Sequence, residues 1–221
     1  MKKLSLMMLA AAVTFAACNN ASDADKAIAA EEKAVANAEG TNYKIDTAST
    51  VIWTGFKPTG KHDGSFAVSN GSLVMNGENL EGGNFTIDLN TLENIDLAND
   101  AENKAKLEGH LKSPDFFDVA KFPTANFAIT SVEPYVAGSD NTVKLADATH
   151  LIKGNLTLKD STKNISFPAK VSLADNKLTA NADFVIDRTQ WGMNYKGPNN
   201  PQDWFINKDV NIKLNIVSSK N

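Results

Sequence analysis

Few side chains in this sequence could do catalytic chemistry, and their spacing keeps them apart. His62, His110 and His150 are separated by 48 and 40 residues, so no two have the short spacing of histidine metal ligands. We expect each to serve a turn or the surface. Asp115 and Asp118 would share one side of a short helix, where an acid–base pair competes with the simpler interpretation that both suit the helix N-terminus. Phosphate-loop and nucleophile-elbow motifs are also absent, so we predict no catalytic residue, no cofactor and no metal.

Arg188 is a charged residue at a position that the pattern assigns to the interior. It continues the parity of Phe184 and Ile186, whereas Asp187 faces the opposite side of the strand. A buried and unpaired guanidinium would be very costly, so we expect Arg188 near a rim, beside a carboxylate, backbone carbonyls or an anionic ligand group. A structural salt bridge at the rim is the favoured interpretation, and contact with a ligand head group is the alternative.

Cys18 is the single cysteine of the chain, and it follows a segment typical of a secretion signal. Lys2 and Lys3 precede an apolar run over residues 4–17 that is too short to span a bilayer in a mature protein. The small residues before Cys18 resemble a bacterial lipobox, with Phe15 in place of the commonest leucine. We expect residues 1–17 to be removed and Cys18 to be acylated, which would anchor the protein to a membrane. An ordinary signal with a chance cysteine is the alternative.

Charge and composition describe the segment that follows. Without residues 1–17 the chain has 20 basic and 26 acidic residues, a formal net charge of −6, which disfavours nucleic acid as a partner. Residues 19–41 are rich in Ala, Glu and Asp and have only Ile28 and Val35 as sizeable apolar residues, so they cannot bury a core. We interpret residues 18–41 as an acylated N-terminus with a partly helical tether, which would hold the domain about 30 Å from the membrane. A partner-binding helix is the alternative.

The rest of the chain has the period of β-strands. Apolar and polar residues alternate clearly in four later runs, over residues 152–159, 164–173, 177–186 and 210–216, and this predicts an antiparallel sheet with one dry face. Earlier runs begin near Val51 and near Phe85, and Asn70-Gly71 predicts a hairpin turn. About eight such strands can hide their dry faces by closing into a barrel or by packing as a sandwich.

Two helices are expected between the halves. Asn99 and Glu102 resemble a capping box at the start of a side helix that ends near Leu111. Ser113-Pro114 predicts a second, one-turn helix, which Pro123 ends. This short helix carries aromatic residues and would plug one end of the sheet structure.

Small residues on the apolar parity bear on the choice between barrel and sandwich. Gly154, Ala169, Ala180 and Ala182 occupy positions where a solid core would have larger side chains. They either leave room for a cavity or face bulky partners such as Trp53, and the sequence leaves both open. If they leave room, tryptophan at position 180 or 182 should fill the bore.

Three motifs in order resemble the YceI-like family of polyisoprenoid-binding proteins. They are Ser49 to Trp53; Leu111-Lys112-Ser113-Pro114-Asp115-Phe116-Phe117-Asp118 with Phe122-Pro123 and Phe127; and Phe184-Val185-Ile186-Asp187-Arg188 with Trp191-Gly192. The resemblance covers residues 42–219, with Trp191 where the family often has Phe. It implies an all-β fold, an extended eight-stranded antiparallel lipocalin-like barrel whose bore holds a long isoprenoid, such as a quinone or a polyprenyl phosphate.

The apolar inward faces would then be the binding site. The expected lining residues are Trp53, Phe85, Phe127, Ile129, Leu156, Phe167, Ala169, Ala180, Ala182, Phe184, Ile186, Ile212 and Leu214. The expected function is to sequester, transport or store the lipid at a bacterial cell envelope, on the periplasmic or outer-membrane face. The alternative is an anchored structural or stress-response protein with a solid barrel and no ligand. A homodimer is left open.

Overall fold

The computed structural model describes residues 23–140, 142–197 and 206–220. The signal segment and Cys18 lie outside these residues. The elements in chain order are β1 (Asp25–Lys26), β2 (Ile28–Ala30), β3 (Thr41–Ile45), β4 (Thr50–Lys57), β5 (Gly60–Asn76), β6 (Asn79–Asn94), α1 (Ala101–Lys112), β7 (Thr124–Pro134), β8 (His150–Leu158), β9 (Ser161–Ala174), β10 (Lys177–Asp187), the 3-10 helix η1 (Arg188–Trp191) and β11 (Asp209–Lys220).

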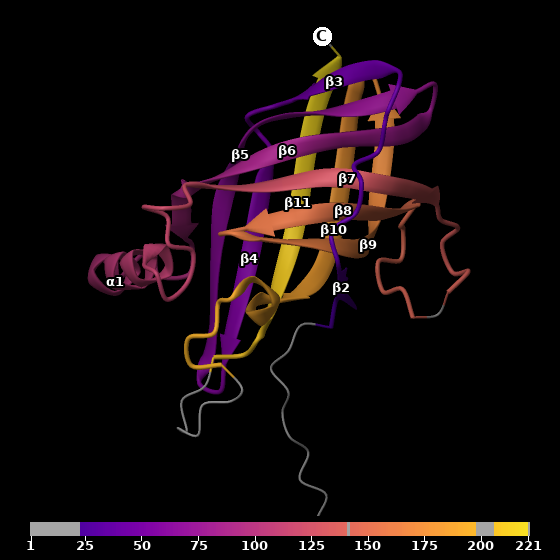
Figure 1. Cartoon of the computed structure of the whole chain (residues 1–221). Helices are drawn as coiled ribbons and strands as arrows, with labels where there is room; N and C mark the ends of the chain where they lie inside the picture. Colours follow the sequence, from indigo (N-terminus) through magenta and orange to yellow (C-terminus); the bar gives the residue numbers. More distant parts are fainter. Residues whose placement is uncertain (1–22, 141, 198–205, 221) are drawn as a thin grey trace, which may run out of the picture.

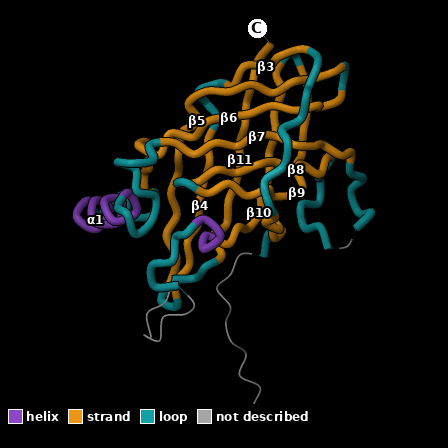
Figure 2. The backbone as a smooth tube through the Cα atoms, in the orientation of Figure 1, coloured by secondary structure: helices purple, strands orange, loops and turns teal. Residues whose placement is uncertain are grey.

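Strands β4 to β11 form a closed barrel of eight antiparallel strands. Each strand pairs with the next along the chain, and β11 pairs with β4 to close the barrel. In Figure 1, β6, β7 and β8 cross in front of β10 and β11, and Figure 2 shows the loops gathered at the ends of the strands. The expected all-β barrel is therefore confirmed, and the sandwich is excluded.

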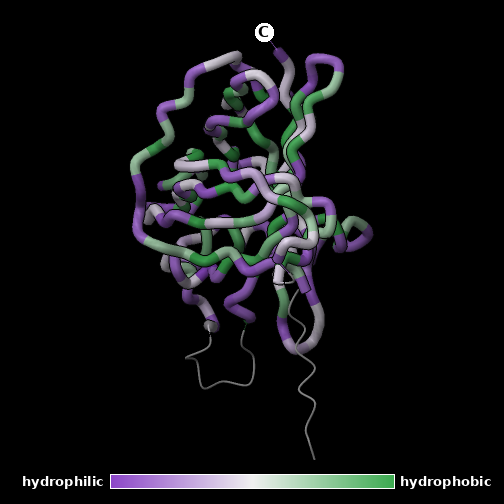
Figure 3. The backbone as a smooth tube through the Cα atoms, turned by 90° about the vertical axis from the view of Figure 1, so that its right-hand side faces the viewer, coloured by the Kyte–Doolittle hydropathy of each residue, from purple (hydrophilic) through white to green (hydrophobic). Residues whose placement is uncertain are grey.

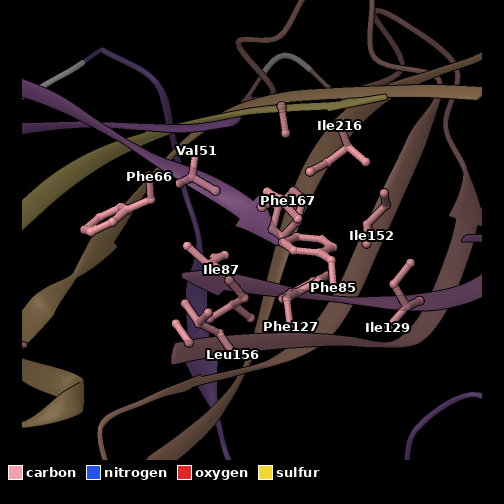
Figure 4. Packing of buried hydrophobic residues seen from close by; sticks show 14 of the residues in the cluster. Val51, Phe66, Phe85, Ile87, Phe127, Ile129, Ile152, Leu156, Phe167 and Ile216 are labelled. Atoms are coloured by element: carbon pink, nitrogen blue, oxygen red, sulfur yellow. The ribbon is translucent and has the colours of Figure 1, made fainter. Parts of the chain in front are cut away.

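The alternation along the strands places one face of each strand inside the barrel. Ile165, Phe167 and Ala169 of β9 are 1–2% exposed, while Lys170, which follows Ala169 on the opposite face of the strand, is exposed. Figure 3 shows hydrophobic and hydrophilic residues following each other closely along the strands. The side chains labelled in Figure 4 come from different strands and meet in one interior cluster.

The N-terminal segment differs from the sequence prediction. A partly helical tether is expected for residues 18–41, but residues 23–41 contain no helix. Instead, β1 pairs with β10 and β2 pairs with β9. Strands β9 and β10 pair with each other only over Lys170–Ala174 and Lys177–Asn181, so the N-terminal segment occupies the opening where they separate. Backbone pairing needs no large apolar side chains, which is why the composition did not predict it.

Residues 31–38 continue across the outer face of β7 and β8. The backbone N–H of Lys33 donates to Asn155 Oδ1 at 3.1 Å, and Asn155 Nδ2 donates to the Lys33 carbonyl at 2.6 Å. The N–H of Ala36 donates to the carbonyl of Ile129 at 3.0 Å. Asn155 and its neighbour Asn164 are therefore buried on the outside of the barrel, at 5% and 4% exposure. We refer to residues 23–38 as the N-terminal strap.

The predicted hairpin at Asn70-Gly71 is wrong. Strand β5 continues through these residues to Asn76, and its pairing with β6 shifts register between Val68 and Asn70. Gly71 has φ +141°, and a Cβ there would lie 2.3 Å from the carbonyl oxygen of Asn84. The dipeptide is therefore a bulge at which β5 and β6 approach closely, because glycine permits positive φ in bulges as well as in turns.

The helical region also differs in detail. The side helix is present as α1, but its N-cap is Asp100, which accepts from the Asn103 N–H at 3.1 Å, so the capping box at Asn99 is not formed. The expected plug helix after Ser113 is a series of turns. Ser113 has ψ 169° and ends α1, because the proline that follows disfavours the helical region. The aromatic segment is at the predicted place but is not helical.

Candidate functional site

A cavity of about 260 Å³ lies inside the barrel. Its walls come from the inner faces of the barrel strands, with α1, the turn at Phe116 and Phe117, and the residues after η1 completing one end. Lining residues at that end, such as Phe56, Leu107 and Ile206, are half-buried, whereas deep residues such as Ile165 are buried. The half-buried end is therefore the mouth of the cavity.

The polar groups of the lining are concentrated at this mouth. Apart from Trp53, the described lining residues with polar side chains are Lys57, His62, His110 and Arg188, all of which carry nitrogen donors. No carboxylate among the described residues lines the cavity. The remaining surface is apolar, so the cavity is suited to an amphiphile whose polar end accepts hydrogen bonds.

His62 connects two charged groups beside the cavity. Its Nδ1 lies 2.8 Å from Asp96 Oδ2, and its Nε2 lies 3.1 Å from Lys57 Nζ. An ammonium group can only donate, so Nε2 accepts and Nδ1 donates its hydrogen to Asp96. Burial acts to raise the pKa of Asp96, but donors from Asp63, His62 and Asn94 outweigh it and lower that pKa. Lys57 has no carboxylate within ion-pair distance in the described part of the chain.

His110 lies at the mouth among aromatic rings. Its ring centroid is 5.2 Å from that of Phe116 and 4.7 Å from that of Tyr195, both at nearly perpendicular angles. Its Nε2 lies 3.0 Å from Asp115 Oδ2. The Asp118 side chain has no matching contact with the described residues, and Asp118 begins a turn with φ 50°. Asp115 thus orients a mouth residue, and the two aspartates do not face each other across the cavity as an acid–base pair would.

Arg188 is buried at 3% exposure, and among the described residues it forms no ion pair with a carboxylate, so the favoured rim salt bridge is not seen there. The guanidinium donates to four backbone carbonyls, those of Asn207, Met193, Tyr195 and Ile206. Its Cζ also lies 5.8 Å from the centroid of the Phe116 ring. Burial lowers the pKa of Arg188, and the nearby Asp187 charge acts in the opposite direction. Arg188 is therefore paired with backbone carbonyls, which was one of the three surroundings expected for it. These hydrogen bonds connect the chain segments on both sides of the loop at the mouth.

Charged groups stabilise the base of the same loop. Lys208 Nζ lies 2.9 Å from Asp187 Oδ2 and 2.7 Å from Asp209 Oδ1, and Lys26 Nζ lies 3.0 Å from Asp209 Oδ2. Burial acts to raise the pKa of Asp187 and of Asp209, but hydrogen bonds from Thr189, Lys208 and Lys26 outweigh it and hold both below the ordinary 3.8. This cluster connects the N-terminal strap to the mouth.

We expect the protein to lose stability in acid partly through this cluster. Because the pKa values of Asp187 and Asp209 are lower in the folded chain than the ordinary 3.8, their contribution is fully present above that value and is lost as the pH falls through the folded values. Urea midpoints measured from about pH 6 to pH 3 should therefore decline. The urea midpoint of the Lys208→Met variant should decline less steeply over this pH interval. If its midpoint falls with pH as steeply as that of the wild type, this cluster is not a source of the acid sensitivity.

Trp53 has a buried donor without a partner. It is 8% exposed, and its Nε1 is the one buried side-chain polar atom of the described residues that lacks a hydrogen bond. The indole lies against Gly64, where a Cβ would be 2.2 Å from Cζ2 of the ring. Buried polar atoms in native proteins nearly always have a partner, which can be a ligand or water. Since Trp53 lines the cavity, its Nε1 can serve a bound molecule.

The predicted lining residues fall into two groups. The main cavity is lined by Trp53, Phe85, Phe127, Leu156, Phe167, Phe184, Ile186, Ile212 and Leu214. The other four, Ile129, Ala169, Ala180 and Ala182, line a second and smaller void of about 20 Å³ at the opposite end. Tryptophan at position 180 or 182 would thus fill the small void instead of the main cavity. Gly154 leaves no room either, because the Phe127 ring occupies the space beside it.

Several functional residues escaped the sequence reasoning. His62 and His110 line the mouth rather than serving only a turn or the surface, while His150 bonds to Thr149 Oγ1 at 2.8 Å outside the cavity. Val51 and Phe66 also line the cavity, and the strand alternation in which they lie would have identified them. By contrast, Lys57, Leu107 and Ile206 lie on a hairpin end, a helix and a loop, where no strand period applies.

A closed antiparallel barrel around an apolar cavity with a polar mouth is the architecture of a lipocalin-like barrel. The family model described as the YceI-like domain matches residues 43–218. The chain therefore belongs to the YceI-like family. Among the residues that the structure describes, no helix is long and apolar enough to cross a bilayer.

Individual relatives agree with this family. The chain is 32% identical over 141 residues to Protein YceI of Salmonella arizonae, and 31% identical over 143 residues to a UPF0312 protein of Enterobacter sp. strain 638. Each match covers 61% of this chain and 64% of the relative's length, so the chain spans less than two thirds of these relatives.

Two solved structures show the same fold. BcnA of Burkholderia cenocepacia aligns with a TM-score of 0.60 at 18% identity, over 79% of this chain and 99% of that one. A polyisoprenoid binding domain of Saccharophagus degradans, described as implicated in plant cell wall breakdown, aligns with a TM-score of 0.58 at 16% identity, over 81% of this chain and 98% of that one.

Proposed function

We propose that the protein binds a polyisoprenoid lipid, such as a quinone or a polyprenyl phosphate, inside its barrel. It would sequester, transport or store that lipid at a bacterial cell envelope. The observation that carries this proposal is the apolar cavity of about 260 Å³ that ends in a polar mouth. The description of the Saccharophagus domain as polyisoprenoid-binding supports the same class of ligand.

Hydrophobic burial alone is sufficient for such binding. An isoprene unit has five carbons, so burying one contributes about 3–4 kcal/mol gross at the usual value per carbon. Association and ordering costs reduce this gain considerably. A few buried units therefore give useful affinity, and the wall needs apolar side chains rather than a polar motif. This cavity has that composition, with its polar groups at the mouth.

The mouth favours a head group that accepts hydrogen bonds. Lys57 and Arg188 both line it as cations without a carboxylate in ion-pair contact among the described residues, and Trp53 Nε1 is a buried donor without a partner. Quinone carbonyls and phosphate oxygens are both acceptors. Either head group would accept from Lys57 and from Trp53 Nε1, and the Arg188 charge beside them would favour it, whereas a cationic head group would be repelled.

The N-terminal strap would place the mouth near a membrane if Cys18 is acylated. Lys26 contacts Asp209 at the mouth end of β11, and Figure 1 shows β2 at the same lower end of the molecule. Asp25 is seven residues beyond Cys18, a distance of at most about 25 Å for an extended chain. This short connection would let lipid pass between the bilayer and the cavity.

A solid envelope protein without a ligand is the competing function. Protein interiors are packed closely and contain few voids larger than a water molecule. A solid barrel would therefore not be expected to retain a cavity of about 260 Å³. We accordingly place binding ahead of a purely structural role.

Native mass spectrometry of protein purified from its own host tests the proposal. We expect an adduct with the mass of an isoprenoid lipid, which organic solvent removes. Ala125→Trp should abolish the adduct, because Ala125 is fully buried and lines the cavity, so the indole would occupy the lipid's space. Asn126→Trp adds the same bulk at an exposed neighbour and should retain the adduct. Wild-type protein without any lipid adduct would contradict the proposal.

A further inference from the structure

Four phenylalanine rings form a continuous row across the barrel interior. Their centroids are 5.3 Å apart between Phe85 and Phe127, 5.7 Å between Phe127 and Phe167, and 4.1 Å between Phe167 and Phe184, the last pair being stacked. Figure 4 shows the first three side chains converging from different strands. All four are 2–5% exposed. We refer to these residues as the phenyl row.

The position of Phe127 in this row is fixed by a glycine. Strand β8 lies between β7 and β9, and Gly154 of β8, which pairs with Ile129, is one inward position away from the partner of Phe127. A Cβ on Gly154 would lie 2.2 Å from Cζ of Phe127, so the ring lies directly against the β8 backbone. Glycine permits this close approach. The ring therefore cannot move outward, and it remains across the bore.

The phenyl row separates two voids. The main cavity of about 260 Å³ lies on the mouth side, and the void of about 20 Å³ lies on the other. The residues that line both are Phe85, Phe127, Phe167 and Leu214. Three members of the row are thus the partition between the voids. Without them the bore would continue toward Ile216 and Ala180, which line only the small void.

We propose that the phenyl row limits the length of lipid tail that the protein holds. This proposal rests on the proposed function. The lining runs from Phe184 on β10 to Arg188 at the start of η1, and from Val51 to Lys57 on β4. These four to six residues correspond to about 13–20 Å at the rise of a strand, and to less along the axis of a barrel with tilted strands. A bilayer has a hydrocarbon core of about 30 Å, so this depth is about that of a single leaflet. The barrel therefore holds a short isoprenoid tail completely, and the far end of a long tail lies outside.

Isoprenoid alcohols of increasing length test this limit. Farnesol, geranylgeraniol and solanesol share one head group and differ only in the number of isoprene units. Their affinities are measured by displacement of tritiated farnesol from delipidated protein. For the wild type we expect similar affinities for all three, because added units are not buried. An open bore would instead tighten binding by about a hundredfold for each added unit buried, and that result would overturn the proposal.

Variants of the row give the complementary test. Phe127→Ala removes the ring between the two voids, and we expect it to bind geranylgeraniol at least about tenfold more tightly than farnesol, since another unit can be buried. Phe122→Ala, a half-buried phenylalanine outside both voids, should keep the wild-type pattern. If Phe127→Ala does not fold, Phe127→Leu makes a smaller opening and should shift the preference in the same direction.

The possible failures can be told apart. If the wild type binds none of the alcohols, the proposed function fails, and the length limit fails with it. If the wild type binds solanesol far more tightly than farnesol, the protein binds isoprenoids but the phenyl row does not stop the tail. If a folded Phe127 variant shows no length preference, the row is likewise not the limit.

Discussion

Removal of the N-terminal strap is expected to lower the free energy of unfolding by about 2–6 kcal/mol. The side-chain amides of Asn155 and Asn164 are buried beneath the strap, and loss of a hydrogen-bond partner or of burial costs about 1–3 kcal/mol for each amide. Asn155 bonds to the Lys33 backbone in both directions, and Asn164 Nδ2 donates to Asn155 Oδ1 at 3.0 Å. The deletion also leaves the separated edges of β9 and β10 unpaired. Urea denaturation of a chain that begins at Glu39, compared with one that begins at Asp23, measures the loss.

Two substitutions separate the strap from a general effect of truncation. Asn155→Ala removes the amide but keeps the strap, so it should reproduce part of the loss. Lys33→Ala keeps the backbone groups that Asn155 contacts and should have little effect, because the Lys33 side chain is exposed. Equal denaturation midpoints for the two chain lengths would show that the strap contributes no stability.

The strap also shows what composition cannot predict. Residues 19–41 lack large apolar side chains, which correctly indicates that they do not build a core. The described part of this segment contributes instead through backbone pairing and through Asp25, whose carboxylate accepts the N–H groups of Lys144 and Leu145. These partners are more than 100 residues away, and no local pattern records such a distant pairing.

The barrel strands were more predictable. An inward face repeats every second residue, so the alternation in the second half identified β8, β9, β10 and β11 and their buried sides. Alternation gives one dry face but does not decide how the faces meet. Closure became predictable through the three family motifs. The bulge at Gly71 was mistaken for a turn because positive φ suits both.

The site was predictable in its walls and not at its mouth. Wall residues such as Phe85 and Leu156 occupy inward strand positions, which the period specifies. The two voids were not predictable, because their separation depends on where the ring of Phe127 lies relative to Gly154. The mouth combines Lys57, His110 and Arg188 from a hairpin end, a helix and a 3-10 helix, and only the fold brings these together.

Replacement of Arg188 by lysine is expected to destabilise the mouth despite the conserved charge. The guanidinium donates to four carbonyls on both sides of the loop, and bonds from a charged donor contribute about 1.5–3 kcal/mol each. Lysine has three donors on a single nitrogen and cannot reproduce this planar arrangement. We expect Arg188→Lys to lower the free energy of unfolding by about 3 kcal/mol or more, since at least two of these bonds are lost. Urea denaturation measures this loss.

Hydrogen exchange distinguishes loss of these bonds from a loss of charge at the mouth. In Arg188→Lys, exchange should accelerate at Ile206, whose N–H donates to the Lys196 carbonyl at 2.7 Å across the loop, before it does so in the barrel strands. Lys196→Met removes a cation from the same loop. This substitution leaves the four hydrogen bonds from Arg188 to backbone carbonyls in place, so exchange at Ile206 should remain slow. Similar acceleration in both variants would mean that charge at the mouth, and not the carbonyl bonds of Arg188, holds the loop in place.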